Sequence, residues 1–501
     1  MKNKISHSIL LLITVLLMGC NDDFLEKSPL GQYATDNFFT DAKGAEAGVN
    51  GAYSYLRHWD IVVWPYVMMG DISSDDTYFG NKNNKPGVEM DQFNFTPASF
   101  GGAVCDNWYT GNFVLIARAN LVINSEPYFE FEESLQKRIL AEARFIRGFA
   151  YFNLVKAFGG VPIITDVTPE LDGEFLTRAS EEETWAIAEE DLNYAIENLP
   201  EKSEYHESQL GKVTKGAAKA MLARAYLFRN DFANVEKYAL EVINSGEYQL
   251  HPNYEEVFML SGENGSGSVF EVQATRSDTG TKLGIDKYST MQGSQGLGWG
   301  ISSPTPEFEA AFEADDPRRE HTIAYIGDIL YDGQTEVKRN SPNHGTMWNQ
   351  KALLPKYAFD PSVSIGGGGG GANNPVNVRI IRYSDVLLMA AEALNENGNP
   401  AQALIYLNMV RERARDGNPT ILPDVTTTDK DALRTAIWHE RRVELGLEQG
   451  RYWDILRQGR AEDLLHAQGI TDYEAVKHRY FPIPQTEIDN TEGSIEQNPH
   501  Y

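Results

Sequence analysis

The sequence predicts a mainly all-α fold: a scaffold of repeated helix pairs that carries one large, irregular, loop-rich excursion. Three observations support this class. Several stretches have the 3.6-residue period of amphipathic helices, and two of them, residues 214–248 and 382–414, share a helix-turn-helix plan. Residues 250–380 are instead rich in Gly, Ser, Asn and Pro and have no sustained helical period.

Two long helices are predicted before the first helix pair. Residues 135–158 place their apolar side chains near one side of a helix, and the glycines at 159 and 160 end it. Residues 182–199 have the same period, with Trp185 and Leu192 on the apolar side. Both helices are expected to pack against a common core.

The two helix pairs turn at Asn230-Asp231 and at the segment 397–400. Each pair is about 33 residues long and has small residues where its helices must approach closely, which is similar to the 34-residue tetratricopeptide repeat. The two copies are not contiguous, because residues 250–380 separate them. The scaffold is therefore predicted to be tetratricopeptide-like, with ligand-binding loops on the excursion.

The chain is strongly acidic, with 44 basic against 72 acidic residues and a formal net charge of −28. Such a surface repels phosphate backbones, so no nucleic-acid partner is expected. With only two cysteines, Cys20 and Cys105, the protein does not rely on disulfides. Cys105 is predicted to be a buried, free thiol, and a bond between the two cysteines is the alternative.

The N-terminus has the features of a signal peptide. Lys2 and Lys4 precede the apolar run Ile9–Met18, which is shorter than the roughly 20 residues that span a bilayer. The run ends in Leu-Met-Gly-Cys at Cys20, which resembles the bacterial lipoprotein signal, whose cysteine receives lipid such as palmitate. A plain secretory signal with a chance cysteine is the alternative.

An acidic pair, Asp22 and Asp23, follows Cys20. It resembles the signal that sends lipoproteins of Bacteroidetes to the outer leaflet of the outer membrane, and a simple solvated tether is the alternative. The expected location is the cell outer membrane, with a lipid anchor and the protein facing the extracellular side.

Catalytic motifs are mostly absent from the sequence. It contains no G-x-S-x-G, P-loop, C-x-x-C or H-E-x-x-H motif, since Val443 stands where His439-Glu440 would need a second histidine. We therefore predict that the protein is not an enzyme and has no cofactor. A glycoside hydrolase stays a remote alternative, because 72 acidic residues offer many carboxylate pairs.

Four stretches, residues 143–164, 380–398, 439–457 and 480–501, together resemble the SusD/RagB family of outer-membrane nutrient-binding lipoproteins of Bacteroidetes. The resemblance implies a tetratricopeptide-like fold and display on the cell surface. It also implies a partner, a SusC-like TonB-dependent transporter, to which the protein delivers a captured glycan while acting as a lid. Binding of peptides or another nutrient on the same scaffold is the alternative.

The residues of these stretches also have structural interpretations. Phe145, Phe149 and Phe152 are expected in the core. A further set of charged residues is expected to form a buried ion-pair network around the last long helix: Glu440, Arg441, Arg442 and Glu444.

A glycan site needs flat aromatic rings for the C–H faces of the sugar and short polar side chains for its hydroxyls. Residues 59–84 and 286–308 combine both on predicted loops. In relatives, ligand contacts come largely from the corresponding segments. The ligand-binding residues expected here are Asp76, Tyr78, Asn81, Tyr288 and Trp299.

Some residues of these loops have competing interpretations. Trp64, Tyr66, Trp108 and Tyr109 are expected in the core, and Trp299 is equally well explained as a structural plug. The group Asp71, Asp75 and Asp76 could hold calcium, although its spacing is not that of an EF-hand.

The predicted organisation has five parts. They are a lipoprotein signal peptide (1–19), a lipid-anchored tether (20–40), an N-terminal SusD-like helical half (41–250), the loop-rich excursion (251–381), and a C-terminal SusD/RagB helical part with its tail (382–501).

Overall fold

The computed structural model describes residues 38–82, 84–167, 176–275, 285–294, 297–339, 345–353 and 375–501. The predicted signal peptide, the lipidation site Cys20 and most of the predicted tether lie outside these residues. Within the described chain, no helix combines the length and the apolar character needed to cross a bilayer.

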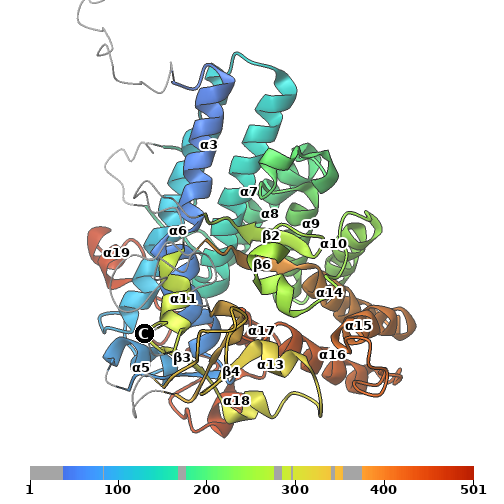
Figure 1. Cartoon of the computed structure of the whole chain (residues 1–501). Helices are drawn as coiled ribbons and strands as arrows, with labels where there is room; N and C mark the ends of the chain where they lie inside the picture. Colours follow the sequence, from blue (N-terminus) through green and yellow to red (C-terminus); the bar gives the residue numbers. More distant parts are fainter. Residues whose placement is uncertain are drawn as a thin grey trace, which may run out of the picture.

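Helices make up most of the described structure, as predicted (Figure 1). Those of the N-terminal half are α3 (Ala42–Leu56), α4 (Trp64–Val67), α5 (Lys85–Asp91), α6 (Gly102–Ile123), α7 (Glu133–Phe158), α8 (Glu181–Asn198), α9 (Lys215–Phe228) and α10 (Phe232–Asn244). Those that follow are α11 (Asp286–Gln292), α12 (Pro306–Glu309), α13 (Arg318–Thr322), α14 (Tyr383–Glu396), α15 (Pro400–Ala414), α16 (Lys430–Glu444), α17 (Arg451–Arg457), α18 (Ala461–Ala467) and α19 (Gln485–Asn490).

Short elements complete the described chain. Two π-helical turns, η2 (Trp59–Val63) and η3 (Met68–Ile72), flank α4, and single 3₁₀ turns occur in several connections. The strands are β1 (Thr77–Phe79), β2 (Ser268–Val272), β3 (Ser302–Pro304), β4 (Ile323–Tyr325), β5 (Met347–Asn349) and β6 (Val378–Arg382). They form three two-stranded antiparallel sheets, β1–β3, β2–β6 and β4–β5.

The predicted helices form within a few residues of their expected ends, and local chemistry explains the ends. Ser180 and Glu183 form a reciprocal capping box at the start of α8. Thr214 accepts a hydrogen bond from the backbone of Ala217 at the start of α9. Helix α7 ends at Gly159, whose positive φ of 72° favours glycine.

The β2–β6 sheet explains how two separated helix pairs form one scaffold. The excursion begins soon after α10, and β6, which pairs with β2, leads directly into α14. Because the two strands are neighbours, the second helix pair returns to the first, and α10 packs against α14. In Figure 1, α3 and α7 rise at the top, α14–α16 lie at the lower right, and β2–β6 lie between them.

One large hydrophobic core connects the N-terminal helices with the C-terminal part. Phe145, Trp108 and Tyr109 are at most 1% exposed, which confirms their predicted place in the core. Cys105 is a buried free thiol, also as predicted, and burial raises its pKa well above the ordinary value. Tyr66 is also buried, whereas Trp64 is only partly buried against the core.

The predicted ion-pair network is present, and Glu440 and Glu444 of α16 are at its centre, both 0% exposed. Arg318 donates to Glu440 at 2.5 Å and to Glu444 at 3.2 Å. Glu444 also accepts from Arg382 at 2.9 Å and from Arg413 at 2.5 Å. Burial acts to raise the pKa of Glu444, but the surrounding guanidinium groups outweigh burial and hold this pKa well below its ordinary value.

The next turns of the chain continue the network toward the N-terminal half. Arg442 pairs with Asp76 at 2.6 Å, and Arg451 donates to both oxygens of Asp75 at 2.7 and 2.8 Å. Arg441 instead donates a hydrogen bond to the carboxylate of Asp385 on α14. The network therefore joins the excursion, both helix pairs and the loop before β1.

We predict that Glu444→Ala lowers the free energy of unfolding by about 3–5 kcal/mol, because several buried arginines lose their shared counter-ion. Urea unfolding followed by circular dichroism measures the change. Glu133 on α7 is the control, because its pair with Lys137 is solvent-exposed. Glu133→Ala should leave the urea midpoint nearly unchanged, and equal effects of the two substitutions would contradict a central role for the network.

Candidate functional site

The two segments that the sequence predicted to be ligand-binding loops lie side by side, but both begin as helix rather than loop: residues 59–72 form η2, α4 and η3, and residues 286–292 form α11. Strands β1 and β3 pair with Tyr78 opposite Ser303 and Phe79 opposite Ser302. Helix α11 also contacts both η2 and α4. Segments that are more than 200 residues apart in the sequence therefore form one surface.

Three partly buried tryptophans form the centre of this surface, and we call Trp59, Trp64 and Trp299 the tryptophan platform. The rings of Trp59 and Trp64 stack with centroids 5.7 Å apart and planes 6° apart. Trp299 meets Trp59 at 6.4 Å with an interplanar angle of 62°. Since each ring keeps part of its area exposed, the platform can contact an amphipathic ligand.

The π-helical turn η2 explains why the first two rings stack. The backbone N–H of Trp64 donates to the carbonyl of Trp59, an i→i+5 bond. This bond places residues five apart above one another, which the 3.6-residue period of an α-helix does not do. Such π turns are frequent at functional sites.

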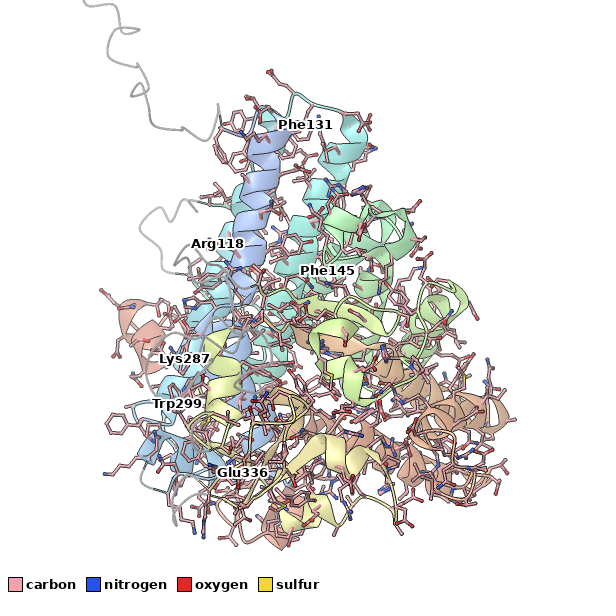
Figure 2. The ribbon with its side chains drawn as sticks, viewed as in Figure 1. Arg118, Phe131, Phe145, Lys287, Trp299 and Glu336 are labelled. Atoms are coloured by element: carbon pink, nitrogen blue, oxygen red, sulfur yellow. The ribbon has the colours of Figure 1, made fainter. Side chains whose placement is uncertain are left out.

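Trp299 is held against α11 by backbone hydrogen bonds. Its N–H donates to the carbonyl of Thr290 at 2.6 Å, and Ile301 donates to Met291 at 2.8 Å. Gly300, between them, has a positive φ of 61°. Lys287 of α11 places its Nζ 5.0 Å from the centroid of the Trp299 ring, and Figure 2 shows the two side chains next to each other.

Tyr288, a predicted ligand contact, is partly buried and its hydroxyl points into the protein. The hydroxyl donates to Gln449 Oε1 at 2.9 Å. Gln449 in turn donates to Asp71, from its backbone N–H at 3.0 Å and from Nε2 at 2.8 Å. Tyr288 therefore anchors α11, and with it Lys287 and Trp299, to the interior.

The structure places Asp76 differently from the prediction. Its side chain is 1% exposed and pairs with Arg442, so it does not face the loop surface. The reason is electrostatic, because the buried arginines of the network need counter-ions. Tyr78 and Asn81 are partly exposed on and just after β1, next to the β3 segment, and their predicted role in ligand binding remains a prediction.

The arrangement of the three aspartates does not fit a calcium site. Asp71 accepts from Gln449, while Asp75 and Asp76 face Arg451 and Arg442. Calcium needs six to eight oxygen ligands, and these carboxylates are turned toward cationic or amide donors. Among the described residues, no group of three or more His, Cys, Asp or Glu side chains is placed to hold a metal ion.

The sequence prediction included Trp299 among the ligand contacts, left Trp59 out of them although it lies in a predicted binding segment, and assigned Trp64 to the core. The five-residue spacing of the two tryptophans was the available signal, although it indicates stacking only if the turn is π-helical. Lys287 and Gln449 carried no sequence signal, because their roles depend on contacts between distant segments.

A helical-repeat scaffold that displays a partly exposed aromatic platform is typical of ligand-binding proteins. The comparison with family models agrees with this class. Residues 244–501 match the SusD family model, and residues 32–227 match the model described as "Starch-binding associating with outer membrane". The chain belongs to the SusD family.

Curated relatives match over most of the chain. "SusD-like protein P2" of Formosa agariphila is 26% identical, and the match covers 100% of this chain and 100% of the relative. A "SusD-like protein" of Bacteroides ovatus is 27% identical over 91% of this chain and 82% of its own length.

Solved structures also resemble this chain over most of its length. A "Laminarin binding SusD-like protein" is 27% identical with a TM-score of 0.74, covering 92% of this chain and 99% of the other. A SusD homologue from Bacteroides thetaiotaomicron has a TM-score of 0.78 at 21% identity, covering 95% and 99%. At 21% identity, the similarity to the Bacteroides thetaiotaomicron structure concerns the fold alone.

We predict that Asp71→Asn changes how stability depends on pH. Burial raises the pKa of Asp71 to about 7, above the value of about 3.9 in an unfolded chain. Between these values the folded state keeps a proton that the unfolded chain has lost. The stability contributed by Asp71 is therefore complete below pH 4 and is lost as the pH rises to 7.

Urea unfolding from pH 4 to 7.5 measures this effect. The wild type should lose roughly 2–4 kcal/mol relative to Asp71→Asn over that range. Asp472→Asn, at an exposed position, is the matched control and should follow the wild-type curve. Parallel curves for the wild type and Asp71→Asn would show that Asp71 does not titrate in this range.

Proposed function

We propose that the protein is a cell-surface glycan-binding lipoprotein that captures an oligo- or polysaccharide and delivers it to a SusC-like TonB-dependent outer-membrane transporter. The observation that carries this proposal is the tryptophan platform, which η2, α4 and the segment after α11 form together. Membership of the SusD family supports it, since one family model is described as starch-binding and associated with the outer membrane.

The chemistry of the platform suits a neutral glycan. The C–H faces of a sugar ring pack on indole rings, and their hydroxyls need donors and acceptors at the rim. Lys287 next to Trp299, and Tyr78 and Asn81 on the neighbouring β1 segment, are the groups that would meet those hydroxyls. We propose that the protein binds the glycan without catalysing a reaction, so no glycosidic bond is broken.

The first ligands to test are laminarin and starch. A relative 27% identical over most of the chain is described as laminarin-binding, and one matched family model is described as starch-binding. Calorimetric titration with these, other polysaccharides and a protein digest distinguishes the alternatives. Saturable heat with one glycan class supports the proposal, saturable heat with the digest alone favours a peptide binder, and continuing heat after each injection indicates a hydrolase.

Trp299→Ala should weaken binding of the glycan that titrates by at least ~10-fold, because it removes one ring of the platform. Calorimetry or affinity electrophoresis measures the change. Trp438→Ala is the matched control, since Trp438 is also partly buried but lies on α16, outside the platform. Unchanged affinity in Trp299→Ala, or an equal loss in both variants, would contradict the proposed site.

We further predict that Cys20→Ser abolishes attachment to the outer membrane when the full chain is expressed in a Bacteroidetes host. The thiol that would accept the lipid is then absent, and no helix among the described residues could cross a bilayer instead. Membrane fractionation and protease treatment of intact cells measure attachment and exposure. A variant that stays in the membrane fraction would show that the protein is held there by something else.

A further inference from the structure

A cavity of about 100 Å³ lies in the scaffold, apart from the tryptophan platform. Its walls come from α7 and α9 on one side and from β6, α16 and α17 on the other, so it lies where the two helical parts of the chain meet. The volume is enough for several water molecules or a small organic molecule. Of the residues that the sequence predicted to contact a ligand, Asp76 lines this cavity, whereas Tyr78, Asn81, Tyr288 and Trp299 do not.

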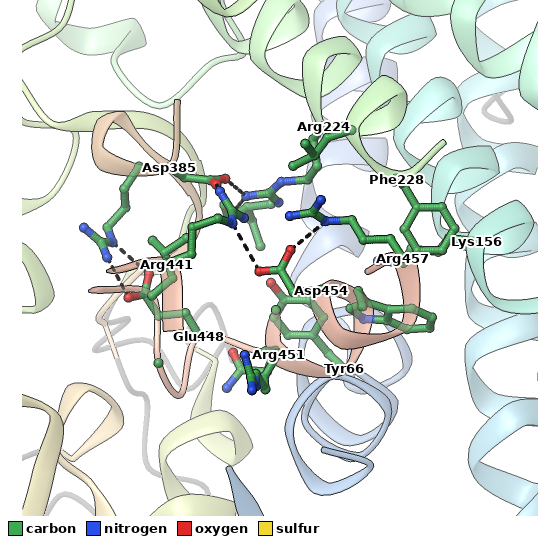
Figure 3. A pocket seen from close by; sticks show the side chains of 18 of the residues that line it. Tyr66, Lys156, Arg224, Phe228, Asp385, Arg441, Glu448, Arg451, Asp454 and Arg457 are labelled. Atoms are coloured by element: carbon green, nitrogen blue, oxygen red, sulfur yellow. Dashed lines mark hydrogen bonds and ion pairs between the residues drawn. The ribbon is translucent and has the colours of Figure 1, made fainter. Parts of the chain in front are cut away.

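Most charges in the cavity wall are paired, as Figure 3 shows. Arg224 and Arg441 donate to opposite oxygens of Asp385 at 2.5 and 2.7 Å. Arg457 donates to Asp454 at 2.8 Å and also to Glu392 outside the cavity. These groups form closed pairs and leave little net charge.

Lys156 of α7 is the exception. Its side chain lines the cavity and the residue is 6% exposed. No described carboxylate pairs with its Nζ, and no described oxygen accepts a hydrogen bond from it. Its neighbours are aromatic rings, with Nζ 4.6 Å from the centroid of Trp453 and 4.8 Å from that of Phe152.

An unpaired ammonium in such a place is unfavourable. Burial, and after it the positive charge of Arg224, hold the pKa of Lys156 well below its ordinary value. A bound anion would supply the missing counter-charge. The cavity is only partly enclosed, and the side chains of Arg224, Arg442 and Asp454 in its wall are 27%, 19% and 16% exposed.

The wall also limits what kind of anion fits. Phe149, Phe152 and Trp453 form an apolar side next to Lys156. Six arginines also line the cavity, but each of them already pairs with a carboxylate of the protein. Among the described lining residues, Lys156 is the cation left without such a partner, and one ammonium group matches one negative charge. The ligand should therefore carry a single negative charge and a hydrocarbon part.

We propose that this cavity binds a small organic monocarboxylate, whose carboxylate pairs with Lys156 and whose hydrocarbon part packs on Phe149, Phe152 and Trp453. The site is independent of glycan binding, so either proposal can fail without the other.

Calorimetric titration of the protein with sodium butyrate and with butyramide tests the proposal. The two probes are similar in size and differ in charge, so butyrate should bind saturably and butyramide at least ~10-fold more weakly. Equal binding of the two probes, or no saturable binding of butyrate, would overturn the proposal. This comparison needs only the wild-type protein.

Variants then locate the site. Lys156→Met should weaken butyrate binding at least ~10-fold and leave glycan binding unchanged. Lys237→Met is the matched control, because Lys237 also lies over an aromatic ring, 4.4 Å from the centroid of Tyr238, but is exposed and outside the cavity. Retained butyrate affinity in Lys156→Met, or an equal loss in Lys237→Met, would exclude Lys156 as the anion partner.

Discussion

The buried ion-pair network around Glu444 is the interaction on which the rest of the structure depends. Its arginine partners come from three separate segments: Arg318 from α13, Arg382 from β6 and Arg413 from α15. A buried carboxylate is tolerated only when such donors surround it, and each arginine in turn needs the carboxylate. We infer that this mutual requirement defines how the excursion and the second helix pair dock on each other, while burial of apolar surface supplies the main driving force.

The same network determines the geometry of the binding loops. Arg442 holds Asp76 just before β1, and β1 pairs with β3 next to the loop that carries Trp299. Gln449, in the turn between α16 and α17, joins Asp71 to the hydroxyl of Tyr288 on α11. Rings that contact a glycan need a fixed spacing, and these interior bonds provide it while the three tryptophans stay partly exposed.

Much of the fold was predictable because helix periodicity is a local property. The stretches 135–158 and 182–199 became α7 and α8 nearly at their expected ends, since apolar period, caps and glycine stops lie in the same short segment. The sequence did not reveal that Asp76 pairs with Arg442, because an aspartate beside aromatic residues looks the same whether it faces solvent or an arginine. Trp64 was expected in the core, and it is partly buried there, but the predicted loop around it is a helical stretch that begins with the π-helical turn η2.

The sequence by itself determined the class of fold, the family, the acidic surface and the two loops that carry aromatic residues, because composition, periodicity and motifs are readable along the chain. Only the tertiary structure decided which residues of those two segments come together. The platform joins Trp59 to Trp299, and the cavity joins Lys156 to Trp453. Such contacts between distant segments depend on how the core packs and on which buried charges find partners, and no local pattern encodes them.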